Sequence, residues 1–434
     1  MNTEIKHKWG FRKERKSDMV NTKVYKVFLR AIALAMNGKP YTRCPSLTGE
    51  EWQMLLDLSR NQNMISLVYD ALAQTAVWEP EDKNPVCARF HREAQLLMIR
   101  QVRKSVEFEK DYRAFQESGV DPIVVKGIIC RDTYPNPDLR PSADEDFLVR
   151  PDELVKLDNF LMWKGFIRDK EIPKGEIPDE MGYVNLKRDL YYELHTQLFK
   201  DSKAFGDYNK VFEDASEHSV CVTADGVKFR TLDHTEHLFF LLTHLLKHFI
   251  HGGVGVRQAC DLFTFSRKWS EQIDWEKMKG WIVSYGLETF WMNLLELGQR
   301  VLGFSPAEYG MCTFKGIRTD SKDMLLDMLD AGVFGASTEE RQHSANMTER
   351  AAEGAGGLAS GVLRSLFPQR EYMEGVYPFV KGRPWLLPGA YGMRIAGYLK
   401  RRRTGRAEGV HAEKSALTLG RERTRMLKKY RIGT

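Results

Sequence analysis

Hydrophobic residues recur at helical spacing through the first quarter of the chain. Val24, Phe28 and Ile32 follow one another four residues apart, and similar spacing continues to about residue 118. Apolar positions three and four residues apart lie on one face of an α-helix. Gly119 ends this pattern well, because glycine readily adopts the positive φ angle of a helix C-terminus. We therefore predict a helical region over residues 21–118.

The pattern changes after Gly119 to short β-branched and alternating runs separated by turns. The segment Arg150-Pro-Asp-Glu opens a helix, with Pro at its start and acids in its first turn. Gly165 closes that helix. Strands are predicted at 122–126, 144–149, 183–186 and 190–198. This order predicts an α+β protein with a small mixed-sheet domain over residues 119–230.

Helical spacing returns after this domain and continues for about a hundred residues. Helices are predicted at 231–250, 257–268, 274–283 and 287–302. A stretch rich in Gly, Ala, Ser and charge then reads as a linker. The expected units are a basic disordered N-terminus (1–20), a helical region (21–118), the α/β domain (119–230), a helical domain (231–333), a flexible linker (334–360) and a C-terminal segment with a basic tail (361–434).

Charge is concentrated at the C-terminal end of the 434-residue chain. The formal net charge is +6. Residues 400–434 contain twelve Lys or Arg against three Glu, so they carry a net charge of +9 and the rest of the chain about −3. Two interpretations of the tail remain open: a surface for an anionic partner such as RNA, acidic protein or lipid, and a solvated terminus.

The cysteine and hydrophobic patterns limit where in the cell the protein is expected. The six cysteines are scattered and include no CxxC pair. This spacing argues against a disulfide framework and against a structural zinc site. The N-terminus has no apolar core of a secretion signal. The most apolar segment, Leu238–Ile250, is too short and too polar to span a bilayer. We expect a cytoplasmic protein.

Asp144 and Asp146 are the strongest candidates for chemistry. On a strand over 144–149 they project from the same side, with Cβ atoms about 7 Å apart. Such carboxylates can bind hard divalent cations, which stabilise the attacking and leaving oxygens in phosphoryl transfer. Taken alone, Asp-x-Asp is also common on solvated strand edges.

Period-2 alternation in the segment 190–198 places Glu193 and His195 on one face of the next strand. Beside the aspartates, Glu193 would be a third carboxylate, either a metal ligand or a general base. His195 would orient Glu193, contact phosphate, serve as a base or fill space on the sheet.

Histidines at 244, 248 and 251 follow one another on a predicted helix. The four-residue spacing suits a zinc pair, but no Glu lies inside the motif as a metalloprotease requires. Histidines that flank an active cleft, or that pack in a core, are the favoured interpretations, with His248 or Asp261 supporting the site indirectly. The glycines at 252–255 follow a helix and lack a GK[ST] ending, so they do not form a phosphate loop.

Several motifs together resemble the DNA polymerase β-like nucleotidyltransferase superfamily, and within it the bacterial proteins called uncharacterised nucleotidyltransferases. The motifs are Lys126-Gly127, Tyr134-Pro135-Asn136-Pro137, Arg140, Asp144-Glu145-Asp146-Phe147-Leu148-Val149, Glu193-Leu194-His195, the pair His244 and His248, and Asp261-Leu262. The resemblance covers most of residues 95–400. The chain departs from the usual superfamily pattern at two places. Lys126-Gly127 stands where Gly-Ser is usual, and Glu145 stands where an aliphatic residue is usual.

The resemblance implies a metal-dependent enzyme that transfers a nucleoside monophosphate from an NTP to an acceptor. It implies that Asp144, Asp146 and Glu193 hold Mg²⁺ or Mn²⁺. Lys126, Gly127 and Arg140 would contact the nucleotide, with Ser142 and His195 as further candidates. Two other interpretations stay open: Lys126 as a residue that extends its ammonium to solvent at a strand end, and Arg140 as a salt bridge that anchors the loop. The acceptor is open between a small molecule, RNA and protein. Two alternatives remain: an inactive nucleotide-binding or scaffold module, which both departures favour, and a toxin-like enzyme that modifies tRNA or protein.

Overall fold

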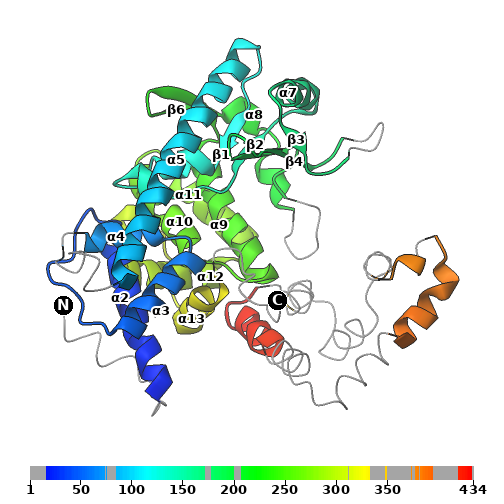
Figure 1. The fold of residues 1–434 in the computed structure, drawn as a ribbon. Coiled ribbons are helices and arrows are strands. Elements are labelled where there is room, and N and C mark those ends of the chain that lie inside the picture. Colours follow the sequence, from blue (N-terminus) through cyan, green and yellow to red (C-terminus); the bar gives the residue numbers. More distant parts are fainter. Residues whose placement is uncertain are drawn as a thin grey trace.

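The structure is a computed structural model in which a mixed sheet lies at one end of the molecule and helices fill the rest (Figure 1). It describes residues 16–73, 75, 85–171, 177–199, 207–310, 312–332, 348, 373, 377–380, 382–393 and 419–432. The predicted 334–360 linker lies outside the described residues except for Thr348.

Seven strands form one sheet in the order β3-β4-β5-β2-β1-β7-β6. They are β1 (Ile123–Val125), β2 (Glu145–Leu148), β3 (Ile167–Arg168), β4 (Glu180–Asn185), β5 (Leu190–His195), β6 (Val220–Ala224) and β7 (Val227–Thr231). The pairs β1–β7 and β2–β5 are parallel, and the others are antiparallel. The predicted α+β class with a mixed sheet is confirmed.

The β6–β7 hairpin is absent from the sequence-based prediction. Its turn is Asp225-Gly226, and both residues have positive φ, at 47° and 74°. Asp-Gly between alternating residues is the signal of a two-residue hairpin turn. Because β7 continues to Thr231, the helix expected from 231 begins only at His234, where Asp233 accepts a hydrogen bond from the Thr235 amide at 2.9 Å.

Helices surround the sheet and continue away from it. They are α2 (Lys16–Ala35), α3 (Gly49–Asn61), α4 (Ile65–Leu72), α5 (Pro85–Glu117), α6 (Gly127–Arg131), α7 (Pro151–Trp163), α8 (Ala215–His218), α9 (His234–His251), α10 (Val256–Lys268), α11 (Trp275–Ser284), α12 (Glu288–Leu297) and α13 (Lys322–Ala331). The long helix α5 joins the sheet to the N-terminal helices (Figure 1). The predicted helices over 150–165, 257–268 and 274–283 are confirmed within a few residues. The one expected over 287–302 ends as α12 at Leu297, and a π-turn completes it.

One face of the sheet is covered by α5 through aromatic side chains. The Phe108 ring of α5 lies 5.7 Å from Phe147 of β2 and 5.8 Å from Tyr192 of β5, between ring centroids. Because neighbouring side chains on a strand alternate, Asp146 and Glu193 must point to the other face. Helix α9 covers that other face and supplies histidines to it.

The N-terminal and C-terminal helices share one hydrophobic core with the sheet. Gln62 joins them: its Nε2 donates to the Met328 carbonyl at 2.8 Å, and its Oε1 accepts from the Val256 amide at 2.9 Å. These bonds link residues far apart in sequence, so the helical regions pack as one body around the sheet.

Part of the basic tail is built into this core. Residues 419–429 are helical, and the Tyr430 side chain is fully buried. Arg423 donates to the carbonyl of His251 at 3.2 Å and to that of Phe249, both in the last turn of α9. A cation there complements the negative end of the helix dipole. Residues 401–403 of the tail lie outside the described residues.

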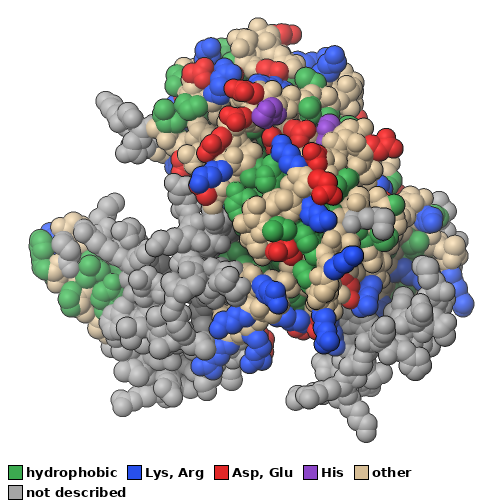
Figure 2. All heavy atoms as spheres, turned by 180° about the vertical axis from the view of Figure 1, so that it is seen from behind, with side chains coloured by type: hydrophobic (Ala, Val, Ile, Leu, Met, Phe, Trp, Pro, Cys, Tyr) green, Lys and Arg blue, Asp and Glu red, His purple; other side chains and the backbone are tan. Residues whose placement is uncertain are grey.

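Charge is unevenly spread over the face seen in Figure 2: acidic side chains gather in its upper half, and Lys and Arg side chains gather in its lower middle. Among the described residues, no helix combines the length and apolarity needed to cross a membrane.

Candidate active site

Asp146 and Glu193 lie side by side on two parallel central strands. The register of β2 and β5 places Asp146 directly opposite Glu193. One ligand atom from each of Asp146, Glu193 and His195 lies within 4.8 Å of the others. The predicted meeting of Glu193 with the Asp-x-Asp segment is therefore present in the structure.

His195 bridges the two carboxylates. Its Nε2 lies 3.1 Å from Asp146 Oδ1 and 3.5 Å from Glu193 Oε2. Burial alone would lower the pKa of His195, but the hydrogen bonds to both carboxylates raise it to about 9. Without a bound cation, His195 is therefore protonated at neutral pH and compensates part of the negative charge.

Lys126 brings a second cation to the same carboxylate. It follows β1 with a φ angle of 56°, and its Nζ lies 2.7 Å from Asp146 Oδ2. Burial alone would lower the pKa of Lys126, but the carboxylates of Asp146 and Asp144 outweigh burial and raise it. Burial raises the pKa of Asp146 in turn, and the Lys126 ammonium and His195 bring it below its ordinary value. The centre is thus a compact set of opposite charges.

A histidine from α9 holds the strained backbone of Lys126. The Lys126 amide donates to His237 Nε2 at 3.1 Å, so the His237 proton resides on Nδ1. Nδ1 then donates to Thr231 Oγ1 at 3.1 Å, and that hydroxyl donates to the Val124 carbonyl at 2.7 Å. Burial lowers the pKa of His237 to about 3, which keeps it neutral. This chain of bonds compensates the positive φ of Lys126.

Two further α9 histidines lie against the Lys126 side chain. His244 Nε2 is 3.1 Å from Lys126 Nζ and 3.2 Å from His248 Nε2. Because an ammonium group only donates, His244 Nε2 accepts. Burial lowers the pKa of both histidines, that of His248 to about 3. The expectation that these histidines flank the site agrees with the structure. His244 Nε2, which a zinc pair would need as a ligand, already accepts from the Lys126 ammonium.

Asp144 lies one residue before β2 and is half-buried. It shares a strand face with Asp146 by alternation, although it is not part of the three-residue cluster. Its charge reaches the site electrostatically by raising the Lys126 pKa.

Glu145 points to the opposite face, as the alternation predicts, and caps α6. Its Oε2 accepts the Ile128 amide at 2.9 Å. Burial raises the Glu145 pKa to about 7, against the opposing effect of Arg131. A Cβ atom on Gly127 would lie 1.7 Å from Glu145 Oε2, so glycine is required there. The Ile128 amide, at the start of the helix expected to approach phosphate, is thus already bonded to a carboxylate.

Arg140 and Ser142 are bonded to other protein groups around the turn and the loop that lead to the cluster. Arg140 pairs with Asp261 through two bonds of 2.9 Å and donates to the Gly127 carbonyl at 3.3 Å. Both members of this pair are buried. The Ser142 hydroxyl donates to the Asp144 carbonyl at 2.8 Å. Arg140 thereby supports the Lys126-Gly127 turn, and Ser142 shapes the segment before the aspartates.

The donor set fits a hard divalent cation. Carboxylate oxygens suit Mg²⁺ and Mn²⁺, and an imidazole nitrogen adds a ligand better suited to Mn²⁺. The Asp146 and Glu193 carboxylates and the His195 ring supply these donors at one point.

The role of His237 could not be read from the sequence. The sequence shows only that His237 lies on the same predicted helix as the other histidines. Its partner, the Lys126 amide, lies 111 positions away.

Comparison with known proteins agrees with this geometry. A family described as uncharacterised nucleotidyltransferase matches residues 48–303, more than half of the chain. The chain therefore belongs to this family of nucleotidyltransferases, which are transferases. No curated protein and no solved structure matches the chain significantly.

Proposed function

We propose that this protein transfers a nucleoside monophosphate from an NTP to an acceptor hydroxyl in a reaction that depends on Mg²⁺ or Mn²⁺. The single observation that carries the proposal is the in-register pairing of Asp146 with Glu193, with His195 and Lys126 on the same carboxylate. Membership in a nucleotidyltransferase family and the Asp-x-Asp strand also support a relationship to the DNA polymerase β-like superfamily.

Asp146 and Glu193 would hold the cation, with His195 or Asp144 completing its ligands. When bound, the cation neutralises phosphate charge and polarises the reacting phosphoryl group. His195 is cationic while it bridges the carboxylates, so its proton must leave before its nitrogen can become a ligand.

The reaction would proceed by in-line displacement at the α-phosphorus. The acceptor oxygen forms a new bond to phosphorus while the bond to the pyrophosphate oxygen breaks. Glu193 is the proposed base that receives the hydroxyl proton. Lys126 lies on the opposite side of β2 from Glu193, where its ammonium would bind the departing phosphates.

The remaining candidate residues would position this machinery. Because Gly127 has no Cβ atom, the Glu145 carboxylate can lie against the turn after Lys126. Arg140 holds the Gly127 carbonyl, and Ser142 holds the carbonyl of Asp144. We propose that both act on the nucleotide through the loops that they fix.

Calorimetry with ATP, CTP, GTP and UTP, each with Mg²⁺, Mn²⁺ or EDTA, tests this function. We expect one nucleotide to bind with metal and to lose binding in EDTA. Asp146→Asn should abolish this binding, whereas the exposed Asp152→Asn serves as a control for carboxylate loss. Binding by Asp146→Asn equal to that of the wild type would refute the metal assignment.

One observation favours nucleotide binding without turnover as the second candidate. The Glu145 carboxylate occupies the Ile128 amide, and Lys126 is already paired with Asp146. Metal-dependent NTP binding with no transfer of the α-phosphate to any acceptor would support this alternative.

A further inference from the structure

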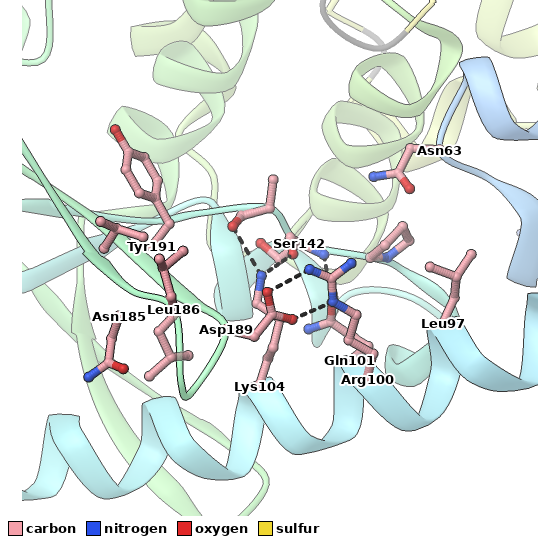
Figure 3. Close-up of a pocket in the computed structure, with 14 residues that line it drawn as sticks. Asn63, Leu97, Arg100, Gln101, Lys104, Ser142, Asn185, Leu186, Asp189 and Tyr191 are labelled. Atoms are coloured by element: carbon pink, nitrogen blue, oxygen red, sulfur yellow. Dashed lines mark hydrogen bonds and ion pairs between the residues drawn. The ribbon is translucent and has the colours of Figure 1, made fainter. Parts of the chain in front are cut away.

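A cavity of about 260 Å³ lies at the end of the sheet where β2 and β5 begin, between α5, the loop 141–143 and the turn that joins β4 to β5 (Figure 3). Asp146, Glu193 and His195 do not line it. Ligand pockets for small molecules begin near this size. The 141–143 loop runs directly into Asp144, and Tyr191 of β5 lies on the cavity wall. The cavity therefore shares two chain segments with the candidate active site.

The sheet order places one wall of this cavity, the β4–β5 turn, on the opposite side of β2 from Lys126. Lys126 follows β1 on one side of β2, whereas β5 and β4 lie on the other. Tyr191 precedes Glu193 by two residues on the same strand face, a separation of about 7 Å. If the phosphates lie toward Lys126, an in-line attacking group must approach from the β5 side of β2, the side on which the β4–β5 turn of the cavity lies.

The cationic side chains that line the cavity already form bonds to protein groups. Arg100 forms two bonds to the Asp189 carboxylate, one of them at 2.5 Å. Lys104 donates to the carbonyls of Ser142 and Ala143 at 2.8 and 3.0 Å. Phosphate esters and RNA backbones are bound mainly through charge-assisted bonds from Lys and Arg, and in this cavity the Asp189 carboxylate offsets the Arg100 charge. This lining therefore disfavours a strongly anionic ligand.

Uncharged hydroxyl groups suit the remaining lining. The Asn63 carboxamide makes no hydrogen bond within the described part of the chain and lies at the cavity (Figure 3). A carboxamide both donates and accepts, as a hydroxyl does. Leu186, at the tip of the hairpin, is 82% exposed, and Leu97 lines the cavity from α5. Such apolar side chains can cover the C–H faces of a sugar ring or polyol.

We propose that this cavity binds the acceptor, and that the acceptor is a small uncharged polyhydroxy compound of the saccharide or polyol class. The proposal rests on the nucleotidyl transfer proposed above and identifies its substrate class. One hydroxyl attacks the α-phosphorus, its proton passes to Glu193, and pyrophosphate leaves. The product is the nucleotidyl ester of the polyhydroxy compound.

The test uses the full chain with Mg²⁺ and the NTP that binds most tightly in calorimetry, labelled at the α-phosphate. Three acceptor probes are compared: an equimolar mixture of hexoses, pentoses and alditols, bulk tRNA, and casein. We expect label on a low-mass product of the first mixture. Label on tRNA or casein alone would overturn the proposal, as would no label on any probe while NTP binding is intact.

Variants locate the site. Leu186→Asn removes an exposed apolar contact, and Asn63→Gly removes the carboxamide while tolerating the φ angle of 50° at that position. We expect each to raise the acceptor KM about tenfold, with the calorimetric Kd for NTP unchanged. Leu96→Asn is the matched control, because Leu96 is 66% exposed on α5 outside the cavity.

The outcomes separate the two proposals. Wild-type acceptor KM in both cavity variants would refute this binding site without affecting the proposed activity. Absence of NTP binding in the wild-type protein would instead overturn the proposed function, and the acceptor assignment with it.

Discussion

A single methyl group at Gly127 tests how the turn at the candidate site is built. In Gly127→Ala the new Cβ would lie 1.7 Å from Glu145 Oε2 and 2.7 Å from its Cδ. The carboxyl group would have to move and give up its 2.9 Å bond to the Ile128 amide. Glu145 is only 7% exposed, so solvent cannot replace that bond.

Two costs add in this variant. Losing a buried hydrogen bond costs about 1–3 kcal/mol, depending on how far the carboxyl group is ionised. Placing alanine at a φ angle of +32° adds about 1–2 kcal/mol of backbone strain. We expect the free energy of unfolding to fall by about 2–5 kcal/mol, a large part of the stability of an ordinary protein.

Urea unfolding of four proteins measures this: wild type, Gly127→Ala, Glu145→Ala and the double variant. Removing the Glu145 side chain gives the methyl group space, so the two substitutions should couple by about 1–3 kcal/mol. Gly119→Ala is the control, because its φ angle is +78° but a Cβ there meets no atom within 4 Å. If Gly127→Ala is no more destabilising than Gly119→Ala, or the coupling is absent, the steric argument is wrong.

Three further predictions concern ionic contacts away from the metal ligands. Burial raises the pKa of Asp158, but bonds from Arg168 at 2.7 and 2.5 Å bring it below its ordinary value. Its stabilising effect is therefore present above the unfolded pKa of about 3.9 and lost as pH falls through the folded value, so Asp158→Asn should flatten the acid side of a Tm-against-pH profile. An unchanged acid slope would contradict this. Arg140→Leu leaves the buried Asp261 carboxylate without its Arg140 cation, although the Tyr134 hydroxyl still donates to it at 2.6 Å. The variant should therefore cost about 3–5 kcal/mol in urea unfolding, and Asp261→Leu should restore part of that stability. If the second substitution instead adds to the loss, the pair is not the cause. Arg423→Met removes donors to the last turn of α9 and should lower stability by about 1–3 kcal/mol, measured by thermal unfolding. A Tm equal to that of the wild type would show that the C-terminal helix is dispensable.

Local patterns determined which side chains share a strand face. Alternation alone placed Asp144 with Asp146, Glu193 with His195, and Glu145 on the opposite side. These inferences need only the period of a strand, so they hold whatever the strand packs against. The Asp225-Gly226 hairpin was equally local and was missed, because its turn signal lies between two strands of only five residues.

The pairing of strands and the approach of helices were decided by tertiary structure. The sequence left Arg140 open between a phosphate contact and a loop-anchoring salt bridge, and could not name a partner for it or for Lys126. In the structure Arg140 is paired with Asp261, 121 positions away, and Lys126 contacts His244, 118 positions away. Such partners depend on how α9 and α10 pack against the sheet, and no local period encodes that packing.

The cavity between α5 and the β4–β5 turn also arises from tertiary packing. Its walls come from α5, the 141–143 loop and the β4–β5 turn, which meet only after the sheet has formed. Sequence periodicity therefore determined the class of chemistry, because ligand types and their face are local properties. The charge balance around Lys126 and the shape that would select an acceptor arise from long-range packing, which brings together residues that no short segment contains.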